Sequence, residues 1–595
     1  MALSRNGCVM KTSSIARVCL VTLALGASGG GAYVFFASAT AGGASWLDWA
    51  RTALLAITLF WLVLGTSFGL VGSLLPAGRK PAAMAASPRG RTAILMPVYN
   101  EDPQASFARI AAMNRDLVRL GAESRFDFII LSDTTRDAVA AEEADWFARL
   151  LDEPGAAGRV YYRRRERNIG RKAGNIEDFV SRSGAAYDYA LILDADSLMS
   201  GETIVEMAQR MDENSRLGLL QTVPRVIAAR SFFGRCMQFS AGCFSPHFAR
   251  GAALLQGDEG PYWGHNAIVR MSAFAACCGL PELSGPAPHG GHILSHDYVE
   301  AALLARGGWQ VHVDPRLGGS FEEGPDNLIE YAKRDRRWCQ GNLQHRRILG
   351  APRLLWWSRF TLLQGIMAYL ASPLWLALLL TSLLASVMPQ RVFADSVMLE
   401  AEAGLMALAI AVFSILVLPK LLIVLRGLLD GRNKRFGGTG AVLISVLVEI
   451  AFSTVMAPVM LVLQTRAIAQ TLLGTDGGWP ATARDGSRVT LSEGFAASWW
   501  IVALGISAIG VTAVLTFDSL VWVLPVALPL LLAPFLIAFS SAPLAKRSWL
   551  LGTPESLDPP RVVRTYLEVF EAWSKTGVNH FAQGWQLKDA ARVSA

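Results

Sequence analysis

The feature that most restricts how this chain can fold is a long segment without any apolar stretch long enough to span a membrane, set between such stretches on both sides. Two stretches, roughly residues 18–37 and 50–75, precede residue 90, and several more follow residue 350. About 20 apolar residues are enough to cross a bilayer as a helix. Of the 595 residues, 52% are hydrophobic and 17% are charged. We therefore expect a membrane protein with one domain outside the bilayer, over residues 91–350.

The N-terminal stretches set the expected orientation. The first, Val18–Ala37, is compatible with a membrane helix or with a signal peptide, because Ala37–Ala41 has the small residues of a cleavage site. The second is followed by four basic residues: Arg79, Lys80, Arg89 and Arg91. Basic residues mark the cytoplasmic side of spanning helices. We predict a transmembrane pair over residues 1–90 and a cytosolic domain directly after it.

Membrane segments also dominate the C-terminal part. Four stretches are long enough to span, roughly Gly365–Val387, Ala403–Leu425, Trp499–Thr516 and Leu520–Phe539. A further run, Ala441–Leu463, contains Glu449 and Pro458. The basic residues after this run and in the tail can both be cytoplasmic only if the run lies in the interface or re-enters, or if the chain has one more span than these stretches indicate. We predict transmembrane and interfacial helices over residues 351–545 and a soluble cytosolic tail over 546–595.

Charge and cysteine content exclude several classes of protein. The net charge of +7 is explained by basic residues at cytoplasmic helix ends, and no basic run alternates with aromatic residues as in nucleic-acid-binding motifs. Nucleic acid is therefore not an expected partner. The seven cysteines are odd in number and lack the paired spacing of zinc sites. A disulfide framework is therefore not expected, and the central domain is predicted to lie in a reducing compartment.

Residues 91–350 alternate short apolar runs with helical patterns, which is typical of βαβ units. Five runs are predicted as strands: Thr92–Val98, Phe126–Ser132, Val160–Arg163, Tyr187–Asp194 and Leu217–Thr222. In open α/β sheets, ligands bind outside the carboxyl ends of the strands. Polar residues directly after these runs are therefore the first candidates for a functional site.

The strongest candidate is the stretch LILDADS, Leu191–Ser197. Its two aspartates, Asp194 and Asp196, follow a predicted buried strand, and alternate residues of an extended chain share a face. Two carboxylates on one side suit Mg²⁺ or Mn²⁺, which completes its shell with water and phosphate oxygens. The chemistry indicated is a metal-bound nucleotide diphosphate. The alternative is an Asx turn that only ends a strand.

Two more clusters suit the same nucleotide. Pro97–Glu101, which contains Tyr99 and Glu101, and Asp133 follow the first two strands, where a carboxylate can accept hydrogen bonds from a base or ribose. The alternative there is turn capping. The run Asn168–Asn175 places two glycines, Arg171 and Lys172 just before a predicted helix, which suits phosphate binding. The alternative is a solvated basic loop, and the arginines upstream are expected at the surface: Arg163, Arg164, Arg165 and Arg167.

The last two clusters lie further along the chain. Asp297, in Ser295-His296-Asp297, is either the N-cap of the helical run Tyr298–Arg306 or a general base. The nearby histidines do not form a zinc pattern and are expected to be ordinary polar residues. In Lys333–Asn342, Arg337 and Trp338 place a cation beside an aromatic ring, which suits a pyrophosphate and a stacked sugar or base. The alternative is an interfacial helix whose long basic side chains reach the headgroup region, and the two interpretations are compatible with each other.

Taken in order, PVYNE, Asp133, KAGN, DADS, HD and RRW resemble the processive enzymes of glycosyltransferase family 2, of the cellulose synthase type. Three longer strings resemble more closely the glucans biosynthesis glucosyltransferase H family, the inner-membrane synthases of osmoregulated periplasmic glucans. These strings are Tyr262–Arg270, Ser295–Trp309 and Tyr331–Asn342. The resemblance is specific over Arg91–Gly350 and looser over the flanking membrane segments.

The resemblance implies a GT-A, Rossmann-like α/β domain in the cytoplasm, inserted between α-helical transmembrane segments of a multi-pass inner-membrane protein. It implies UDP-glucose as donor, Mg²⁺ or Mn²⁺ as cofactor and inversion at the anomeric carbon. The implied product is a linear β-1,2-glucan that passes through the membrane to the periplasm. The implied partners are the growing glucan, membrane lipid, acyl carrier protein and periplasmic glucan-processing proteins.

The resemblance also implies residue roles. Asp133 is expected to bind the uridine moiety, Lys172 the nucleotide side and Asp194 the UDP, while Asp196 is expected to hold the metal. Asp297 takes the place of the base in the family's TED motif. Arg337 and Trp338 take the places of the closing Arg-Trp of the Q-x-x-R-W motif.

Two departures bear on the acceptor contacts. The TED motif is Ser295-His296-Asp297 here, and Arg334 stands where the glutamine of Q-x-x-R-W is expected. Both weaken a reading as cellulose synthase. The alternatives within enzymes are a β-1,4 or β-1,3 glycan synthase and a lipid-phosphate glycosyltransferase. The alternative outside enzymes is a membrane sensor or export scaffold with an inactive domain, which predicts the loss of Asp196, Asp297 or Trp338, and all three are present.

Overall fold

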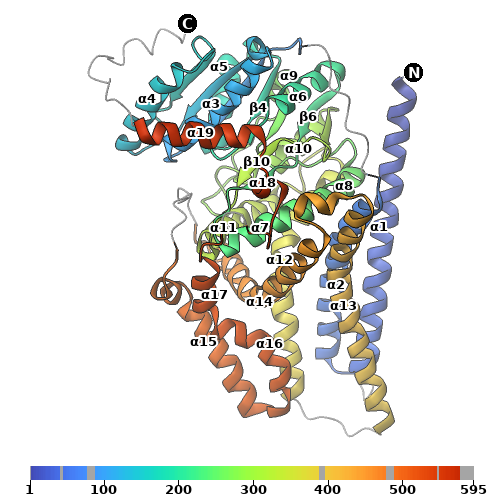
Figure 1. Cartoon of the computed structure of the whole chain (residues 1–595). Coiled ribbons are helices and arrows are strands. Elements are labelled where there is room, and N and C mark those ends of the chain that lie inside the picture. The colour runs from blue at the N-terminus through green and yellow to red at the C-terminus, as the bar shows by residue number, and fades with distance from the viewer. Residues whose placement is uncertain are drawn as a thin grey trace.

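The chain forms a sheet domain at one end and a group of long helices at the other (Figure 1). The structure is a computed structural model, and it describes residues 2–40, 44–76, 87–387, 395–476, 488–545 and 548–576. Several residues named above lie outside these ranges, among them Arg79, Lys80, Ala41 and the tail beyond residue 576.

The central element is a seven-stranded mixed sheet in the order β3-β2-β1-β4-β8-β6-β9. Its strands are β1 (Thr92–Val98), β2 (Phe126–Ser132), β3 (Val160–Arg164), β4 (Tyr189–Ile192), β6 (Leu217–Gln221), β8 (Ala267–Arg270) and β9 (Gln310–Val313). β1 is parallel to β2 and β4, β3 is parallel to β2, and β8 runs antiparallel between β4 and β6. The carboxyl ends of β1, β2, β3 and β4 therefore meet at one edge.

The alternation of side chains along β1 explains why the domain has helices on both faces. Ile94, Met96 and Val98 belong to one core cluster, whereas Ala93 and Leu95 belong to the other. The first cluster includes residues of α3 (Pro103–Arg119), α4 (Asp137–Leu151) and α6 (Gly201–Glu213). The second includes residues of α5 (Arg171–Ser183), α9 (Met271–Cys277) and α10 (His296–Arg306). A strand buried on both faces reads as a continuous apolar run, which is why β1 and β2 were predictable to the residue.

A second, three-stranded sheet lies beside the first. It contains β5 (Leu198–Met199), β10 (Ser320–Glu323) and β7 (Arg225–Ile227), in the order β5-β10-β7. β5 follows directly on the predicted metal-binding turn, and Phe321 of β10 pairs with Leu198 of β5. This pairing brings Glu322 and Glu323, at the end of β10, towards the same edge as Asp194 and Asp196.

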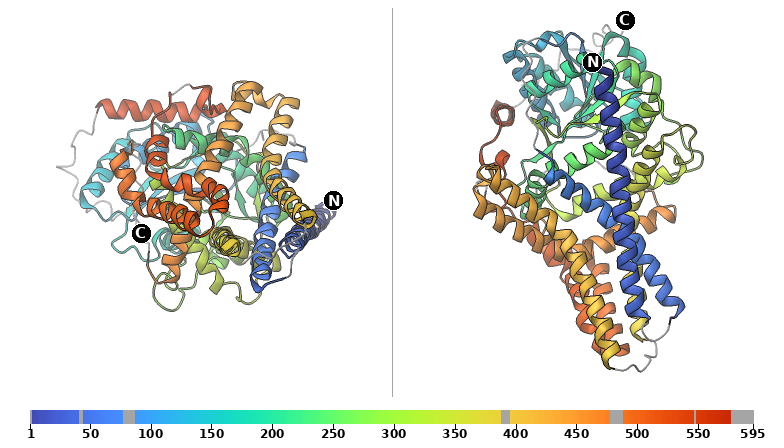
Figure 2. Two further views of the ribbon diagram at one scale, coloured as in Figure 1. Left: turned by 90° about the horizontal axis from the view of Figure 1, so that it is seen from below. Right: turned by 90° about the vertical axis from the view of Figure 1, so that its right-hand side faces the viewer.

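Six helices among the described residues are long and apolar enough to cross a membrane. They contain Thr12–Ala39, Trp46–Leu74, Trp356–Val387, Glu402–Leu429, Thr439–Leu472 and Leu491–Leu515. The whole elements are α1 (Ala2–Ala39), α2 (Trp46–Leu74), α12 (Trp356–Val387), α13 (Asp395–Leu429), α14 (Thr439–Leu472) and α15 (Leu491–Leu515). Figure 2 shows α1 running from the level of the sheet domain down along α2. In this structure the first apolar stretch is thus part of a packed helix.

Two expectations about the C-terminal helices need correction. The run Ala441–Leu463 lies within α14, which is one continuous helix long enough to span, so the expectation of a re-entrant segment is wrong, whereas an interfacial position stays a prediction. The stretch Leu520–Phe539 is not one straight helix, because α16 (Leu520–Leu531) and α17 (Ala533–Ser540) belong to a pair bent by 53°. Pro525, Pro529 and Pro534 lie in these helices, and proline removes a backbone donor and breaks helical geometry.

The remaining helices include those that connect the two parts of the molecule. They are α7 (Phe232–Cys243), α8 (Ser245–Gln256), α11 (Leu328–Gln344), α18 (Pro554–Leu557) and α19 (Arg561–Thr576). α8 packs against α1 and α2, and α11 packs against α12 and α14. The C-terminal helix α19 lies across the sheet domain beside α3 (Figure 1). Its residues Val562 and Trp573 belong to the core of that domain.

Candidate active site

One cavity of about 470 Å³ lies at the carboxyl ends of β1, β2 and β4. The first turns of α5 and α10 and one side of α11 also line it. All nine residues that the sequence singled out line this cavity: Tyr99, Glu101, Asp133, Lys172, Asp194, Asp196, Asp297, Arg337 and Trp338. The structure thus brings together residues separated by more than 200 positions in the chain. Their individual roles remain predictions.

The turn Asp194–Ala195–Asp196 follows β4 and is closed by local hydrogen bonds. The backbone N–H of Asp194 donates to Ser197 Oγ at 2.9 Å, and the N–H of Ser197 donates to the Asp194 carbonyl at 3.0 Å. Asp196 is 8% exposed, whereas the Asp194 side chain is 41% exposed. The turn therefore presents one open and one enclosed carboxylate to the cavity.

Lys172 lies in the first turn of α5 and meets the open carboxylate. Its ammonium is ion-paired with Asp194 and donates to the Gly264 carbonyl at 2.6 Å. Two glycines make this helix start possible. Gly170 has a positive φ of 71°, and a Cβ on Gly174 would lie 2.1 Å from the Ile169 carbonyl oxygen. A side chain at position 174 would therefore displace the backbone that carries Lys172.

Asp133 is held by a network that the sequence did not reveal. Arg165 donates to both of its carboxylate oxygens at 2.8 Å, and Asn175 Nδ2 donates to Oδ1 at 2.8 Å. Burial raises the pKa of the Asp133 carboxyl, and the Arg165 guanidinium opposes that effect. The prediction that Arg165 is a surface residue is wrong, because its side chain is only 11% exposed. Its contact with Asp133 spans 32 residues, which local pattern cannot show.

Asp297 lies in the first turn of α10. The helix begins at His296 with Ser295 as its N-cap residue, so the alternative reading of Asp297 as the N-cap is wrong. Ser295 Oγ donates to Asp297 Oδ1 at 3.0 Å, and His345 Nε2 donates to the Ser295 carbonyl at 2.9 Å. A Cβ on Gly264 would lie 3.5 Å from the Asp297 carboxylate, so the glycine leaves room beside it. Asp297 is thus oriented and faces the cavity.

Arg337 and Trp338 come from α11, and Arg334 lies one turn before Trp338. The Arg334 guanidinium sits 4.3 Å from the centre of the Trp338 ring, which is 42% exposed. A cation over an indole face is a stabilising arrangement that leaves the opposite face for a ligand. Because α11 also packs against α12 and α14, the helix both lines the cavity and borders the membrane helices.

The sequence agrees with known families over most of its length. The family model for glycosyl transferase family 2 matches residues 93–277, and that for glycosyl transferase family group 2 matches residues 189–424. A glucans biosynthesis glucosyltransferase H from Cereibacter sphaeroides is 47% identical over 570 residues, which cover 94% of this chain and 95% of the relative. The chain belongs to the glucans biosynthesis glucosyltransferase H family.

Further relatives agree with this assignment. The proteins of the same name from Rhodopseudomonas palustris (strain TIE-1) and Caulobacter vibrioides (strain NA1000 / CB15N) are each 40% identical. The alignments cover 90% and 92% of this chain and 76% and 85% of those proteins. Among solved structures, a mannosyltransferase, PcManGT from Pyrobaculum calidifontis in complex with GDP-Man and Mn²⁺, matches with a TM-score of 0.40 and 14% identity. That match covers 72% of this chain and 100% of the mannosyltransferase.

Family membership confirms the coarse predictions from sequence. The protein is a glycosyltransferase with a GT-A α/β domain flanked by apolar helices, and its relatives are named for glucan biosynthesis. The six candidate spans are consistent with a membrane protein of this family.

The cavity also contains charged residues that sequence reasoning missed. His265 Nε2 lies 3.3 Å from Glu322, and both line the cavity. Burial raises the pKa of Glu322, while the charges of His265 and Arg334 oppose this. His265 lies within the quoted string Tyr262–Arg270, but nothing in the sequence places it against Glu322.

The carboxylates in the cavity suit a metal ion that binds together with a nucleotide. Among the described residues, no group of three or more His, Cys, Asp or Glu side chains is placed to hold a metal ion. Asp194 and Asp196 nevertheless line one cavity beside the cations Lys172 and Arg337. Mg²⁺ usually takes one or two carboxylates and completes its shell with substrate phosphates and water. The residues present therefore fit Mg²⁺ or Mn²⁺ bound together with a diphosphate.

Proposed function

We propose that this protein transfers glucose from UDP-glucose to the end of a linear β-1,2-glucan and passes the chain across the inner membrane. The observation that carries the proposal is the convergence of Lys172, Asp194, Asp196 and Asp297 on one cavity. A nucleotide-sugar transferase needs a diphosphate site and an acceptor base side by side. The names of the relatives support glucose and a glucan as the transferred sugar and the product.

On the donor side, Tyr99, Glu101 and Asp133 would bind the uridine, since they lie at the ends of β1 and β2. Lys172 and Arg337 would place fixed positive charge beside the diphosphate. Such pre-oriented charge stabilises a leaving group without reorganisation during the reaction. Mg²⁺ or Mn²⁺, held by Asp196 with Asp194 next to the UDP, would act as a Lewis acid towards the same phosphates.

On the acceptor side, Asp297 would accept the proton of the attacking hydroxyl. In a single displacement, the bond from the acceptor oxygen to the anomeric carbon forms as the bond to the UDP oxygen breaks. The proton passes to the Asp297 carboxylate, UDP leaves, and the configuration at the anomeric carbon inverts. Trp338, with Arg334 on one face, would stack against the acceptor sugar.

The position of the cavity suits export of the product. α11 lines the cavity and packs against α12 and α14, both candidate spans. A glucan that leaves the cavity along α11 would reach these helices directly. With the catalytic domain in the cytoplasm, the chain would emerge in the periplasm. Glucan-processing proteins there and acyl carrier protein in the cytoplasm are the partners that the family implies.

The test is synthesis by the purified full-length protein in vesicles, supplied with radiolabelled UDP-glucose and Mg²⁺ or Mn²⁺. We expect metal-dependent incorporation into a polymer, and linkage analysis should give β-1,2 bonds. A β-1,4 or β-1,3 polymer would overturn the linkage but retain the mechanism. Turnover of another sugar nucleotide, with none of UDP-glucose, would overturn the donor. Binding of UDP without any transfer would favour the inactive sensor or scaffold.

A further inference from the structure

Behind the Asp194–Ala195–Asp196 turn lies a buried cation that does not line the cavity. Arg109, on α3, is 2% exposed. Its Nη1 donates to the carbonyl oxygen of Ala195 at 3.0 Å, and its Nη2 pairs with Glu323 Oε1 at 2.5 Å. Ala195 separates the two aspartates, and Glu323 lines the cavity. One guanidinium thus fixes the backbone between both carboxylates and a cavity wall.

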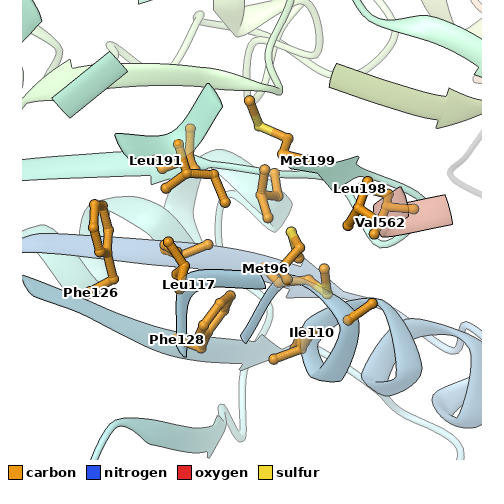
Figure 3. Packing of buried hydrophobic residues seen from close by; sticks show 14 of the residues in the cluster. Met96, Ile110, Leu117, Phe126, Phe128, Leu191, Leu198, Met199 and Val562 are labelled. Carbon is orange, nitrogen blue, oxygen red and sulfur yellow. The ribbon is translucent and has the colours of Figure 1, made fainter. Parts of the chain in front are cut away.

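The third contact of Arg109 comes from the far end of the chain. The Arg109 guanidinium lies 4.9 Å from the centre of the Tyr566 ring, on the C-terminal helix α19. α19 is docked firmly against α3, because Gln104 Nε2 donates to the Phe570 carbonyl at 3.0 Å. Figure 3 shows Val562 of α19 beside Leu198, the first residue of β5. The C-terminal helix therefore contacts both Arg109 and the strand that directly follows the turn.

We infer that Arg109, held in place by Tyr566 of α19, positions the Asp194–Ala195–Asp196 turn for nucleotide and metal binding. Arg109 is a positioning residue, since it touches a backbone oxygen and not the ligand. Its fork geometry satisfies a carbonyl and a carboxylate at once, which a lysine ammonium cannot reproduce in the same orientation. The Tyr566 ring lies against the guanidinium, at 4.9 Å from its central carbon. The C-terminal helix then contributes to the transferase site through its contact with Arg109. This inference rests on the proposed function.

The experiment separates positioning from general stability. The wild type is compared with four single variants, each as full-length protein in detergent. Three are Tyr566→Leu, Tyr566→Phe and Arg109→Lys, and the control is Val569→Ala. Val569 is buried in the same core on the same helix, so its truncation weakens the packing of α19 without removing the ring over Arg109. Three quantities are measured: the thermal unfolding midpoint, Mn²⁺ affinity with saturating UDP by electron paramagnetic resonance, and amide hydrogen exchange over residues 193–199.

Tyr566→Leu and Arg109→Lys should weaken Mn²⁺ binding about tenfold, which corresponds to about 1.4 kcal/mol at 25 °C. Both should also speed exchange over residues 193–199. Tyr566→Phe should keep the wild-type Mn²⁺ affinity, because the ring and not the hydroxyl covers Arg109. Val569→Ala should lower the unfolding midpoint without changing Mn²⁺ affinity or exchange in the turn.

Two results would overturn the inference. One is wild-type Mn²⁺ affinity in both Tyr566→Leu and Arg109→Lys. The other is an equal loss of Mn²⁺ affinity in Val569→Ala and Tyr566→Leu when the two variants have the same unfolding midpoint. Weakened packing alone would then explain the loss. Failure of the proposed function is distinguishable, since wild-type protein would then transfer no glucose from UDP-glucose, whatever the Mn²⁺ affinities of the variants.

Discussion

The ammonium of Lys172 is ion-paired with Asp194, the first carboxylate of the predicted metal-binding turn. The same ammonium donates to the Gly264 carbonyl, and Gly264 adjoins the Asp297 carboxylate. Lys172 therefore links Asp194 to the loop before β8, which borders the predicted base. A lysine in this position can turn its charge towards an incoming diphosphate without leaving the cavity.

Replacing Lys172 by glutamine should reduce kcat/KM for UDP-glucose by about 10²-fold, in the range seen when a single electrostatic donor is removed from an active site. The glutamine side chain is one atom shorter and keeps a polar end but no charge, so the expected loss is mainly electrostatic. Steady-state rates of sugar incorporation measure it. Arg182→Gln is the matched control, because Arg182 is on the same helix, pairs with Asp178 and is 75% exposed. Equal losses in the two variants would contradict a specific role for Lys172.

The buried pair of Arg165 and Asp133 predicts a second effect. Arg165→Lys keeps the charge but cannot donate to both oxygens of Asp133, so the carboxylate loses its orientation. A charge-assisted hydrogen bond contributes about 1.5–3 kcal/mol, and we expect UDP affinity to fall about 10–100-fold. Isothermal titration with UDP measures the affinity. The neighbouring Arg164→Lys is the control, since Arg164 pairs with the exposed Asp137. Unchanged affinity in Arg165→Lys would remove Asp133 from the nucleotide site.

Much of this site was predictable because its residues follow regular elements. Burial on both faces makes β1 and β2 visible as continuous apolar runs, and the residues directly after such runs must lie at one edge of a parallel sheet. Asp133, Asp194 and the start of α5 were therefore predictable as neighbours. Asp297 and Trp338 were candidates by residue type alone, and only the family resemblance gave a reason to expect them at that edge, because no local pattern ties them to it.

The contacts that hold these residues were not predictable, because each joins distant parts of the chain. Arg165 looked like one more cation in a basic loop, and only the fold turns it towards Asp133. The tail was predicted to be soluble, but no local signal places Tyr566 against Arg109, more than 450 residues earlier. The broken helix pair α16 and α17 was missed for a different reason. Its hydropathy suits one span, and hydropathy does not report the bend of 53°.

His296, next to the predicted base, should make stability depend on pH. Burial alone would lower the pKa of His296, but the Glu300 carboxylate, 3.1 Å from Nδ1, outweighs burial and raises the pKa above 6.5. The folded state thus binds this proton more tightly than the unfolded chain. The stabilisation is complete below pH 6.5 and is lost as the pH rises through the raised pKa.

We therefore expect the wild-type unfolding midpoint to decline as the pH rises above 6.5, and the decline to be shallower in His296→Gln. Glu300→Gln should be shallower too, because it removes the charge that raises the pKa of His296. The exposed His292 serves as the control, and His292→Gln should keep the wild-type slope. A wild-type slope in both His296→Gln and Glu300→Gln would show that the pair does not titrate as argued.

The predicted base is the sharpest test of the mechanism. Asp297→Asn keeps the size of the side chain and can keep the hydrogen bond with Ser295, but it cannot take up the acceptor proton. We expect turnover to fall ~10²–10⁴-fold, the usual contribution of a general base, with UDP affinity nearly unchanged. Incorporation rates and UDP titration on the same preparation separate the two effects.

The chain offers a close control for this substitution. Asp137 is also an acidic residue in the first turn of a helix, α4, and its side chain is 97% exposed. Asp137→Asn removes the same interaction with the helix dipole, which contributes about 0.3–1 kcal/mol, but lies outside the cavity. It should keep wild-type turnover. Near wild-type turnover in Asp297→Asn would exclude Asp297 as the base, and another group in the cavity, such as Glu322 beside His265, would have to accept the proton.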